Sequence, residues 1–341
     1  MKAFGITGLN NAFIKPLYMQ IFSQGKLLRK GAMCCAGILL TLTSFYQHAS
    51  ISSQALTNIK EEIAEKQIAE KAIIEQKLED VKVIALAPHI VEMLFSIGAG
   101  DNIIGTSEFS DYPSEAKNIP RIGNYMHISL EKVIALQPDI IIAWKSGSPS
   151  GDLDKLSKLG FNIVYSNPKN FADISKELRY FGSLTGRIST ANKLADAFDL
   201  QINHIKDLYS NKKPLVGFYE LWGNPLTTVS KGSWPQQYFD ICKARNPFEN
   251  VNVSYPQISI ETLLNKNIQF IIQPLSVNQP DKTGFNWQRW SVLPAVKNNH
   301  ILHPDADSLH RMSLRSIHAL DALCKEIDKV RGTLNSRVNI H

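Results

Sequence analysis

Two glutamates stand at equivalent positions of a repeated segment, and their carboxylates are the first candidates for chemistry in this chain. The segments N-Y-M-H-I-S-L-E (124–131) and S-Y-P-Q-I-S-I-E (254–261) align without a gap at an offset of 130 residues, which places Glu131 on Glu261. Paired carboxylates can act as a general acid and base, or can contact a cationic partner. Because each copy carries its own glutamate, the repeat favours two contact points over one acid–base pair.

Histidines form the second chemical candidate. His89 and His127 lie where loops are expected to face a cleft, and His303 and His310 flank the last expected strand. Neutral imidazoles can bind haem iron or other metals, in combination with tyrosine. The alternative, which the sequence favours, is that they are surface or helix-capping histidines. No C-x-x-C spacing occurs, so we predict no cysteine-based metal site.

Catalytic motifs are absent from the sequence. It contains no G-x-G-x-x-G, no G-x-x-x-x-G-K-[ST], no G-x-S-x-G and no H-E-x-x-H. These patterns mark dinucleotide sites, phosphate-binding loops, hydrolase nucleophiles and zinc proteases, respectively. We therefore predict a protein that is not an enzyme and has no prosthetic group. A binding protein would bind its ligand stoichiometrically and leave it unchanged.

Each copy of the repeat predicts a capped helix followed by a buried strand. Ser129 and Ser259 can accept a free N–H at a helix start, and each glutamate then lies in the first turn, where a carboxylate suits the positive helix end. The apolar runs at 140–142 and 270–272 are typical of strands buried on both faces. Two copies indicate two similar lobes, although a capped helix before a strand also recurs by chance.

The order of elements along the chain agrees with two lobes. Alternating strands and helices begin at 81–88 and begin again at 214–221, separated by a long, mostly helical segment at 171–209 with breaks near Gly182 and Gly186. Such alternation is typical of parallel sheets covered by helices. We predict an α/β protein with two Rossmann-like lobes, each with a central parallel sheet, joined by one long rigid helix.

The length of 341 residues is enough for two ordinary cores. The predicted organisation is a leader (1–52), a charged helical spacer (53–81), an N-terminal α/β lobe (82–185), a connecting helix (186–213), a C-terminal α/β lobe (214–331) and a tail (332–341).

The net charge of +6 comes mostly from the leader. Residues 1–52 contain five Lys and Arg and no acid, and the remainder has 32 basic against 31 acidic residues. A nearly neutral folded part argues against nucleic acid as a partner.

The leader itself resembles an export signal. Lys26, Arg29 and Lys30 precede an apolar run at 31–46, and mostly small residues follow at 49–53. We predict export to the periplasm with cleavage near residue 50, and a membrane anchor if the leader is not cleaved. Initiation at Met19 would give a more ordinary signal.

Two cysteines would remain after export. In an oxidising compartment Cys242 and Cys324 most simply form one disulfide, and the alternative is a pair of buried free thiols.

Taken together, several segments resemble the substrate-binding proteins of ABC importers for vitamin B12. The resemblance covers about 82–331 and rests on I-A-L-A-P-H-I-V-E-M-L-F-S-I-G, S-D-Y-P, I-S-L-E-K-V-I-A-L-Q-P-D-I-I-I-A-W, Y-P-Q-I-S-I-E and D-A-L-C-K-E-I. This is the branch of periplasmic binding proteins with a rigid helix between its lobes, which also includes siderophore and haem binders. It implies a transported ligand, cobalamin, held in a cleft between the lobes.

The resemblance also implies which residues contact the ligand. A corrin is a large, flat, mostly apolar ring with amide arms, so aromatic walls and a few polar groups suit it. The implied contacts are Tyr112, Tyr125, Trp144, Trp222, Tyr255, Asp307 and Arg311. Tyr125 and Tyr255 stand where B12 binders often carry tryptophan. Haem or an iron siderophore therefore remains the alternative ligand.

Finally, the resemblance gives the repeated glutamates a role. In this family one surface glutamate on each lobe engages arginines on the two membrane permease subunits of the importer, and Glu131 and Glu261 match those positions. The alternative is that both carboxylates only stabilise helix termini. We expect a monomer whose partners are cobalamin and the permease.

Overall fold

The computed structural model of the chain describes residues 57–70, 77–78, 80–276 and 284–338. The predicted leader therefore lies outside the described residues. The chain divides into two units, Met1–Ala69 and Glu70–His341. Residues 57–70 are helical, and all their side chains are exposed. Within the described residues, no helix has both the length and the apolar character of a membrane span.

The N-terminal lobe is built on a five-stranded parallel sheet in the order β3-β2-β1-β4-β5. Its strands are β1 (Val83–Ala85), β2 (Ile103–Ser107), β3 (Arg121–Gly123), β4 (Ile140–Trp144) and β5 (Ile163–Ser166). Its helices are α2 (Pro88–Ser96), α3 (Leu130–Leu136), α4 (Ser150–Lys158), α5 (Phe171–Leu184) and the 3-10 helix η1 (Ser114–Asn118). The central strands are apolar throughout because both faces are covered. Val83 and Ile142 face the core shared with α2 and α5, whereas Ile84 and Ile141 face the core shared with α3 and α4.

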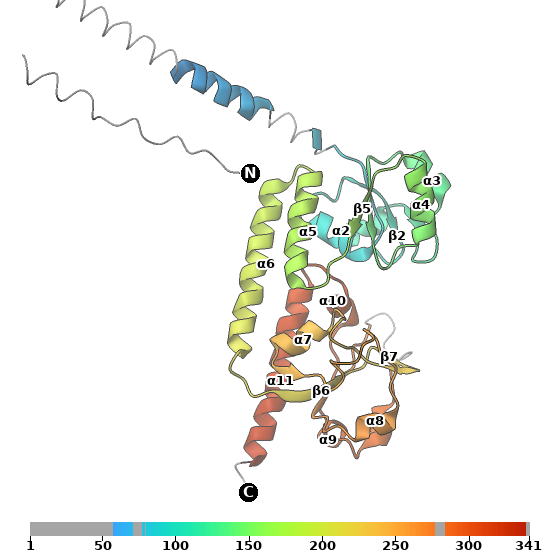
Figure 1. The fold of residues 1–341 in the computed structure, drawn as a ribbon, viewed down its shortest axis with the longest axis vertical. Helices are drawn as coiled ribbons and strands as arrows, with labels where there is room; N and C mark the ends of the chain where they lie inside the picture. The colour runs from blue at the N-terminus through green and yellow to red at the C-terminus, as the bar shows by residue number, and fades with distance from the viewer. Residues whose placement is uncertain (1–56, 71–76, 79, 277–283, 339–341) are drawn as a thin grey trace, which may run out of the picture. The chain divides into compact units, whose positions relative to one another are not determined.

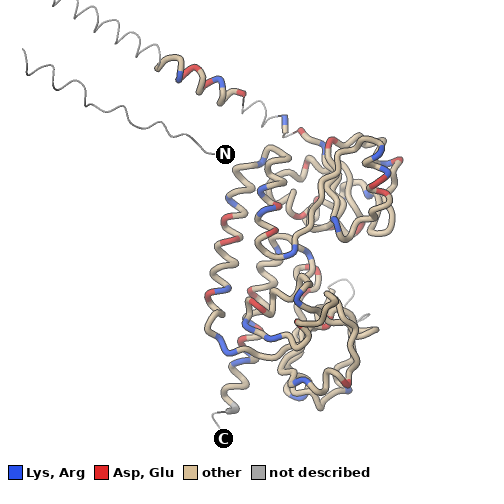
Figure 2. The backbone as a smooth tube through the Cα atoms, in the orientation of Figure 1, with Lys and Arg blue, Asp and Glu red and all other residues tan. Residues whose placement is uncertain are grey.

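The C-terminal lobe repeats this plan with a four-stranded parallel sheet in the order β11-β10-β6-β9. Its strands are β6 (Leu215–Tyr219), β9 (Ala244–Arg245), β10 (Phe270–Ile272) and β11 (Ile301–Leu302), and β7 (Trp222–Gly223) and β8 (Leu226–Thr227) form a separate antiparallel hairpin. Its helices are α7 (Gln236–Ile241), α8 (Ile260–Leu264), α9 (Pro294–Lys297), α10 (Ala306–His310), α11 (Ser316–Val338) and the 3-10 helix η2 (Trp287–Trp290). Figure 2 shows basic and acidic residues interspersed along the backbone of both lobes.

The repeat is confirmed as a local structure. The Ser129 side chain accepts the N–H of Lys132 at the start of α3, and the Ser259 side chain accepts the N–H of Thr262 at the start of α8, each at 3.3 Å. The strand that follows each helix lies beside the first strand of its lobe: β4 pairs with β1, and β10 pairs with β6. The predicted capped helix and buried strand are therefore present in both copies.

One long helix, α6 (Ile188–Tyr209), connects the lobes (Figure 1). The break before it contains Gly186, whose φ of +68° lies in the left-handed region that favours glycine. The buried face of α6 carries residues at helical spacing: Ala191, Ala195, Phe198, Ile202, Ile205 and Tyr209. This face packs against α5 of the N-terminal lobe and against α7 and α11 of the C-terminal lobe. The apolar core is consequently continuous from β1 to β6.

A second junction lies at the start of α5. The ring of Phe171 meets Trp234 edge-on at 5.1 Å and Tyr238 at 5.7 Å between ring centroids. Its backbone N–H donates to Gln237 Oε1 at 2.8 Å. Because Trp234, Gln237 and Tyr238 belong to the C-terminal lobe, this contact ties the two lobes together beside α6.

The last helix extends past residue 331, the predicted end of the C-terminal lobe, and reaches Val338. Gly332 lies within it, exposed, at a usual helix-propensity cost of about 1 kcal/mol. The preceding residue, Arg331, is buried and anchors this part of the helix. Its guanidinium donates to the backbone carbonyls of Lys213, Cys242 and Lys243 at 2.8, 3.0 and 3.2 Å.

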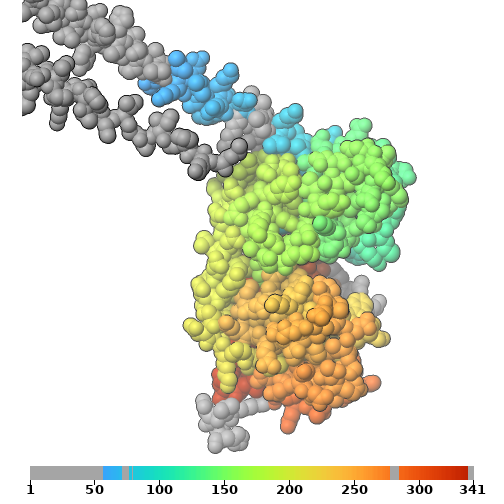
Figure 3. All heavy atoms as spheres, viewed as in Figure 1, coloured from blue at the N-terminus to red at the C-terminus, as the bar shows by residue number. Residues whose placement is uncertain are grey.

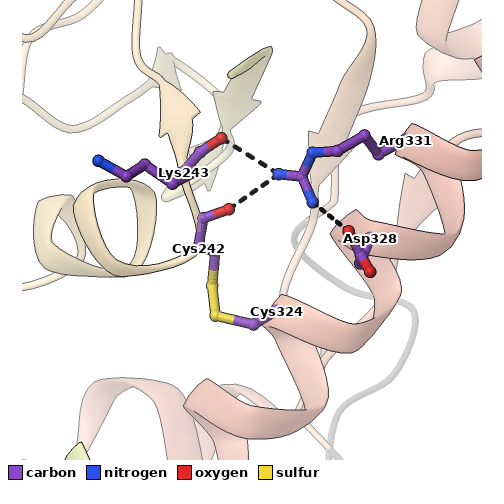
Figure 4. The surroundings of a disulfide bond; sticks show 5 residues. All are labelled: Cys242, Lys243, Cys324, Asp328 and Arg331. Carbon is purple, nitrogen blue, oxygen red and sulfur yellow. Dashed lines mark hydrogen bonds and ion pairs between the residues drawn. A yellow bond between two sulfur atoms is a disulfide. The ribbon is translucent and has the colours of Figure 1, made fainter. Parts of the chain in front are cut away.

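The predicted disulfide is confirmed. Cys242, at the end of α7, is bonded to Cys324 of α11, and both residues are fully buried (Figure 4). Arg331 bridges from α11 to the carbonyl of Cys242 and also pairs with Asp328. The covalent bond and the arginine therefore fix α11 to the same corner of the C-terminal lobe.

Removing this disulfide is expected to destabilise the protein strongly. The bond closes a loop of 82 residues, and in the chain-entropy model its loss lowers the free energy of unfolding by about 4 kcal/mol. The measurement is urea unfolding of the oxidised wild type and of the double variant Cys242→Ala/Cys324→Ala. A difference below about 1 kcal/mol would contradict the prediction.

Candidate ligand-binding cleft

A pocket of about 220 Å³ lies between the lobes, where the carboxyl ends of both parallel sheets point. Figure 3 shows the surface hollowed between the green N-terminal lobe and the orange C-terminal lobe. The N-terminal lobe contributes Trp144, Ser146, Pro168 and Lys169, and the C-terminal lobe contributes Leu221, Gly232, Trp234, Pro235, Tyr255, His310 and Met312. In open α/β sheets, ligands bind outside the carboxyl ends of the strands, where the strand order reverses. Trp144 ends β4, beside β1, at that point of its sheet.

Two close contacts hold the indole ring of Trp144. The ring of His89 meets it edge-on, with centroids 5.6 Å apart and planes at 80°. The backbone of Gly147 lies so close that an added Cβ would come within 1.9 Å of Trp144 Cε3, so this position requires glycine. The backbone N–H of Trp144 donates to Ser148 Oγ at 3.0 Å. These contacts fix one aromatic wall of the pocket.

His89 is in turn fixed by a buried polar chain. Ser166 Oγ donates to Glu177 Oε2 at 2.6 Å, so His89 Nε2 must donate its proton to Ser166 Oγ at 2.9 Å. Burial lowers the pKa of His89 to about 3, so the ring is neutral at physiological pH. Burial also raises the pKa of Glu177. His89 is therefore a supporting residue behind Trp144, and neither a surface residue nor an exposed metal ligand.

The opposite wall of the pocket comes from the C-terminal lobe. Tyr255 precedes α8 in a loop that is tied to the chain after β8, since Thr228 N–H donates to the carbonyl of Pro256 at 3.0 Å. Its side chain is about half exposed, and burial of the remainder raises the pKa of its phenol. Trp234 is 8% exposed and anchors its indole N–H on the carbonyl of Leu309 at 2.9 Å. The structure thus brings Trp144 and Tyr255 to one pocket, as two of the seven residues expected to contact ligand.

Arg311 lies at the junction of the lobes, paired with carboxylates. Its guanidinium is 3.1 Å from Glu92 of α2, 3.3 Å from Asp111 and 3.1 Å from Asp307. Glu92 is almost fully buried and also accepts hydrogen bonds from Arg315 and Ser313. Both Arg311 and Asp307 therefore belong to an ionic bridge between the lobes, which we call the Glu92 bridge.

Tyr112 borders the same bridge. The guanidinium of Arg315 stacks over its ring at 3.9 Å from the centroid, a cation–π contact. Tyr112 lines a second pocket of about 350 Å³, with Glu92, Ser313 and Arg315 among its other walls. Tyr112 is 46% exposed.

Tyr125 and Trp222 are the most exposed of the expected contacts, at 69% and 52%. Neither is among the residues that line the two pockets above. The Trp222 indole N–H donates to the carbonyl of Asn224 within the β7–β8 hairpin, which orients the ring at the surface. Both side chains can reach only a ligand that projects beyond the pocket.

Glu131 and Glu261 are exposed residues on α3 and α8, one on each lobe (Figure 1). In each case the pKa is lowered, first by a hydrogen bond from the glutamate's own backbone N–H and then by one from the capping serine. Both are therefore carboxylates at neutral pH.

Other cleft residues carried little signal in the sequence. Trp234 and Met312 lie outside the segments that carry the resemblance, and Glu92 lies within the mostly apolar segment 90–97. His310 was noted as a histidine near the last strand, but nothing local shows that it faces the pocket. Among the described residues, no three His, Cys, Asp or Glu side chains are grouped to hold a metal ion.

Comparison with known proteins gives consistent matches. The periplasmic binding protein family matches residues 83–307. The vitamin B12-binding protein of Vibrio parahaemolyticus is 34% identical over 250 residues, which cover 73% of this chain and 90% of the relative. That of Yersinia pestis is 29% identical over 249 residues, which cover 73% and 87%.

Solved structures give the same result. The crystal structure of the periplasmic vitamin B12-binding protein of Vibrio cholerae superposes with a TM-score of 0.67 at 33% identity, covering 73% of this chain and 97% of that one. A periplasmic haem-binding protein from Roseiflexus sp. RS-1 superposes with a TM-score of 0.64 at 18% identity, covering 73% and 98%. The second match shows a shared fold alone.

The Glu92 bridge is expected to contribute to stability through its buried carboxylate. Replacing Glu92 by Gln leaves the shape of the side chain almost unchanged but removes the negative charge that pairs with Arg311 and with Arg315. This loss is expected to lower the free energy of unfolding by about 3 kcal/mol. Urea unfolding at pH 7 measures this change. The matched control is Glu115→Gln, an exposed residue of η1, with an expected effect of about 0.5 kcal/mol or less. Equal effects of the two substitutions would contradict the prediction.

His89 is expected to make the protein sensitive to acid. The unfolded chain protonates this histidine near pH 6.5, whereas the folded protein does so only near pH 3. Between these values the unfolded state binds more protons, so the stabilisation present above pH 6.5 is lost as pH falls. Within this range, His89 contributes a slope that approaches about 1.4 kcal/mol per pH unit to the free energy of unfolding. Unfolding curves at several pH values are expected to show a shallower dependence for His89→Gln, and parallel profiles would contradict this.

Proposed function

The chain belongs to the periplasmic binding protein family, and on that premise we propose that it captures a corrinoid of the cobalamin class and delivers it to an ABC importer. One observation carries the proposal: aromatic side chains from both lobes, Trp144 and Tyr255, line one pocket at the carboxyl ends of both sheets. This pocket lies in a chain 34% identical to a vitamin B12-binding protein.

The shape and chemistry of the cleft suit such a ligand. Its aromatic and apolar walls match a flat apolar ring, and its few polar groups match peripheral amides. A pocket of about 220 Å³ holds only part of a corrin. The remainder would extend along the cleft, where Tyr112, Tyr125 and Trp222 would provide aromatic surface.

The proposed role involves no chemical change in the ligand. The family consists of binding proteins that serve transport. Arg311 and Asp307 would act mainly through the Glu92 bridge, by holding the lobes at a fixed spacing. Arg311 would contact the ligand only with the edge of its guanidinium that the bridge leaves open.

We also propose a division of labour along the chain. Residues 1–52 would direct export and be removed near residue 50, and the protein would act in the periplasm as a monomer. Residues 53–81 would serve as a spacer before two ligand-binding lobes, 82–185 and 214–331, with 186–213 between them.

Docking on the importer is assigned to the repeated glutamates. Glu131 and Glu261 are exposed, ionised and placed in the same register of the two lobes. A pair of identical permease subunits offers the same surface twice, so the docking protein benefits from presenting the same carboxylate twice. Arginines on the two subunits would be their partners.

The ligand is tested by titration calorimetry of the purified protein with cyanocobalamin and, separately, with haem. We expect one-to-one binding of cyanocobalamin and its recovery unchanged. Binding of haem without binding of cyanocobalamin would contradict the proposal and establish the alternative ligand.

The docking role is tested by the double variant Glu131→Ala/Glu261→Ala. It is expected to abolish stimulation of the importer, because both charge contacts are lost, while calorimetry gives an unchanged affinity for cyanocobalamin. Ala substitution of Glu108 and Glu326, two other exposed glutamates, one on each lobe, is the matched control. Transport that survived the double change would show that docking lies elsewhere.

A further inference from the structure

His310 occupies a special position on the cleft, at the end of α10. It lines the pocket beside Tyr255 and Trp234, and its Nε2 atom is 2.8 Å from the hydroxyl of Tyr219. Its backbone is fixed as well, because the carbonyl of Leu309 accepts both the indole N–H of Trp234 at 2.9 Å and the hydroxyl of Tyr238 at 2.8 Å. The imidazole is thus tied at its Nε2 atom, and the preceding carbonyl is fixed by two hydrogen bonds.

The ring of His310 is neutral at physiological pH. Burial lowers its pKa to about 4, which outweighs the opposing effects of Asp307 and Asp305. A neutral imidazole carries one proton, on either Nδ1 or Nε2, and the hydrogen bonds around the ring decide which.

Tyr219 determines the position of that proton. Its side chain is fully buried, and burial raises the pKa of its phenol well above the usual value, so the hydroxyl keeps its proton. Among the described residues, His310 Nε2 is the only hydrogen-bond partner of that hydroxyl. If Nε2 were protonated, the buried hydroxyl proton would have no acceptor, which is unfavourable. Tyr219 O–H therefore donates to Nε2, and the imidazole proton lies on Nδ1.

The Nδ1–H group is the free hydrogen-bond donor of the His310 ring within the described part of the protein. No described residue forms a hydrogen bond with Nδ1. In the described part of the chain, Asn167 Oδ1 is the only fully buried side-chain nitrogen or oxygen that lacks a partner. Nδ1 is thus accessible, and the pocket that His310 lines is the space it can reach.

We propose that His310 is a specificity-determining hydrogen-bond donor of the cleft, which selects a ligand carrying a carbonyl or carboxylate oxygen and does not coordinate a metal. A nitrogen that carries a proton has no lone pair for a metal, so this tautomer excludes His310 as an axial ligand of cobalt or haem iron. The inference deepens the proposed function and rests on it for the ligand, whose amide arms supply the carbonyl oxygens. The aromatic walls of the pocket exclude water, which strengthens the hydrogen bond from His310 Nδ1–H to the ligand oxygen.

The tautomer can be measured without any ligand. Selective 15N-histidine labelling of the full chain and long-range 1H–15N correlation at pH 7 distinguish Nδ1–H from Nε2–H, with His310→Asn assigning the signal. We expect Nδ1–H in the wild type and a shift towards Nε2–H in Tyr219→Phe, which removes the donor. An Nε2–H tautomer or an imidazolium in the wild type would overturn the proposal.

Ligand contact is tested by affinity. Loss of one hydrogen bond in His310→Leu is expected to weaken cyanocobalamin binding about 3- to 10-fold. His310→Asn, whose amide places an N–H near the original Nδ1, is expected to recover most of that loss. Equal affinities of His310→Leu and the wild type for cyanocobalamin would overturn the proposal. It would also be overturned if His310→Asn recovered none of the lost affinity while circular dichroism showed both variants to be folded.

The spectrum of aquacobalamin separates donation from coordination. We expect its visible bands to be unchanged when it binds the wild-type protein. A shift typical of imidazole-coordinated cobalt, absent in His310→Leu, would overturn the proposal. Failure of both cyanocobalamin and haem to bind would contradict the proposed function and the ligand contact together. The tautomer of His310, measured in the protein without ligand, tests the hydrogen-bond geometry separately.

Discussion

The structure depends on one apolar core that passes through the connecting helix. The buried face of α6 packs against α5 on one lobe and α7 and α11 on the other, so moving one lobe against the other would expose part of this core. The Phe171 junction and the Glu92 bridge add an aromatic and an ionic contact across the same boundary. A cleft held in this way is largely preformed, and ligand binding then costs less ordering of the protein. It also sets the spacing of α3 and α8, which carry the two proposed docking glutamates.

Each wall of the cleft contains a neutral histidine, but the two act differently. His89 uses its Nε2–H to reach Ser166 and Glu177, and it supports Trp144 from behind. His310 accepts from Tyr219 and presents its other nitrogen to the pocket. In both cases the hydrogen bond behind the ring decides which nitrogen carries the proton. Two residues of the same type therefore serve packing on one lobe and recognition on the other.

The features predicted correctly from sequence were local or covalent. A serine cap, a first-turn glutamate and an apolar run lie within about 15 residues of one another, so the repeat revealed both helix–strand units. The disulfide followed from the count of cysteines. The Glu92 bridge could not be predicted, because Arg311 and Glu92 are more than 200 residues apart and each is unremarkable in its own segment. For the same reason Arg311 and Asp307 were assigned to ligand contact alone, and His310 could not be placed on the cleft.

The most direct measurement is the distance between the lobes with and without ligand. Spin labels would be attached to cysteines introduced at Lys158 and Lys266, exposed residues of opposite lobes. Cys34 and Cys35, the two cysteines of the predicted leader, would be replaced by Ser so that they take up no label. Electron–electron double resonance is then recorded without ligand and with saturating cyanocobalamin. The account predicts tight binding with a mean distance that changes by about 1 Å or less, as in other preorganised complexes. A closure of more than about 2 Å on binding would contradict it, because the core through α6 would then not fix the cleft.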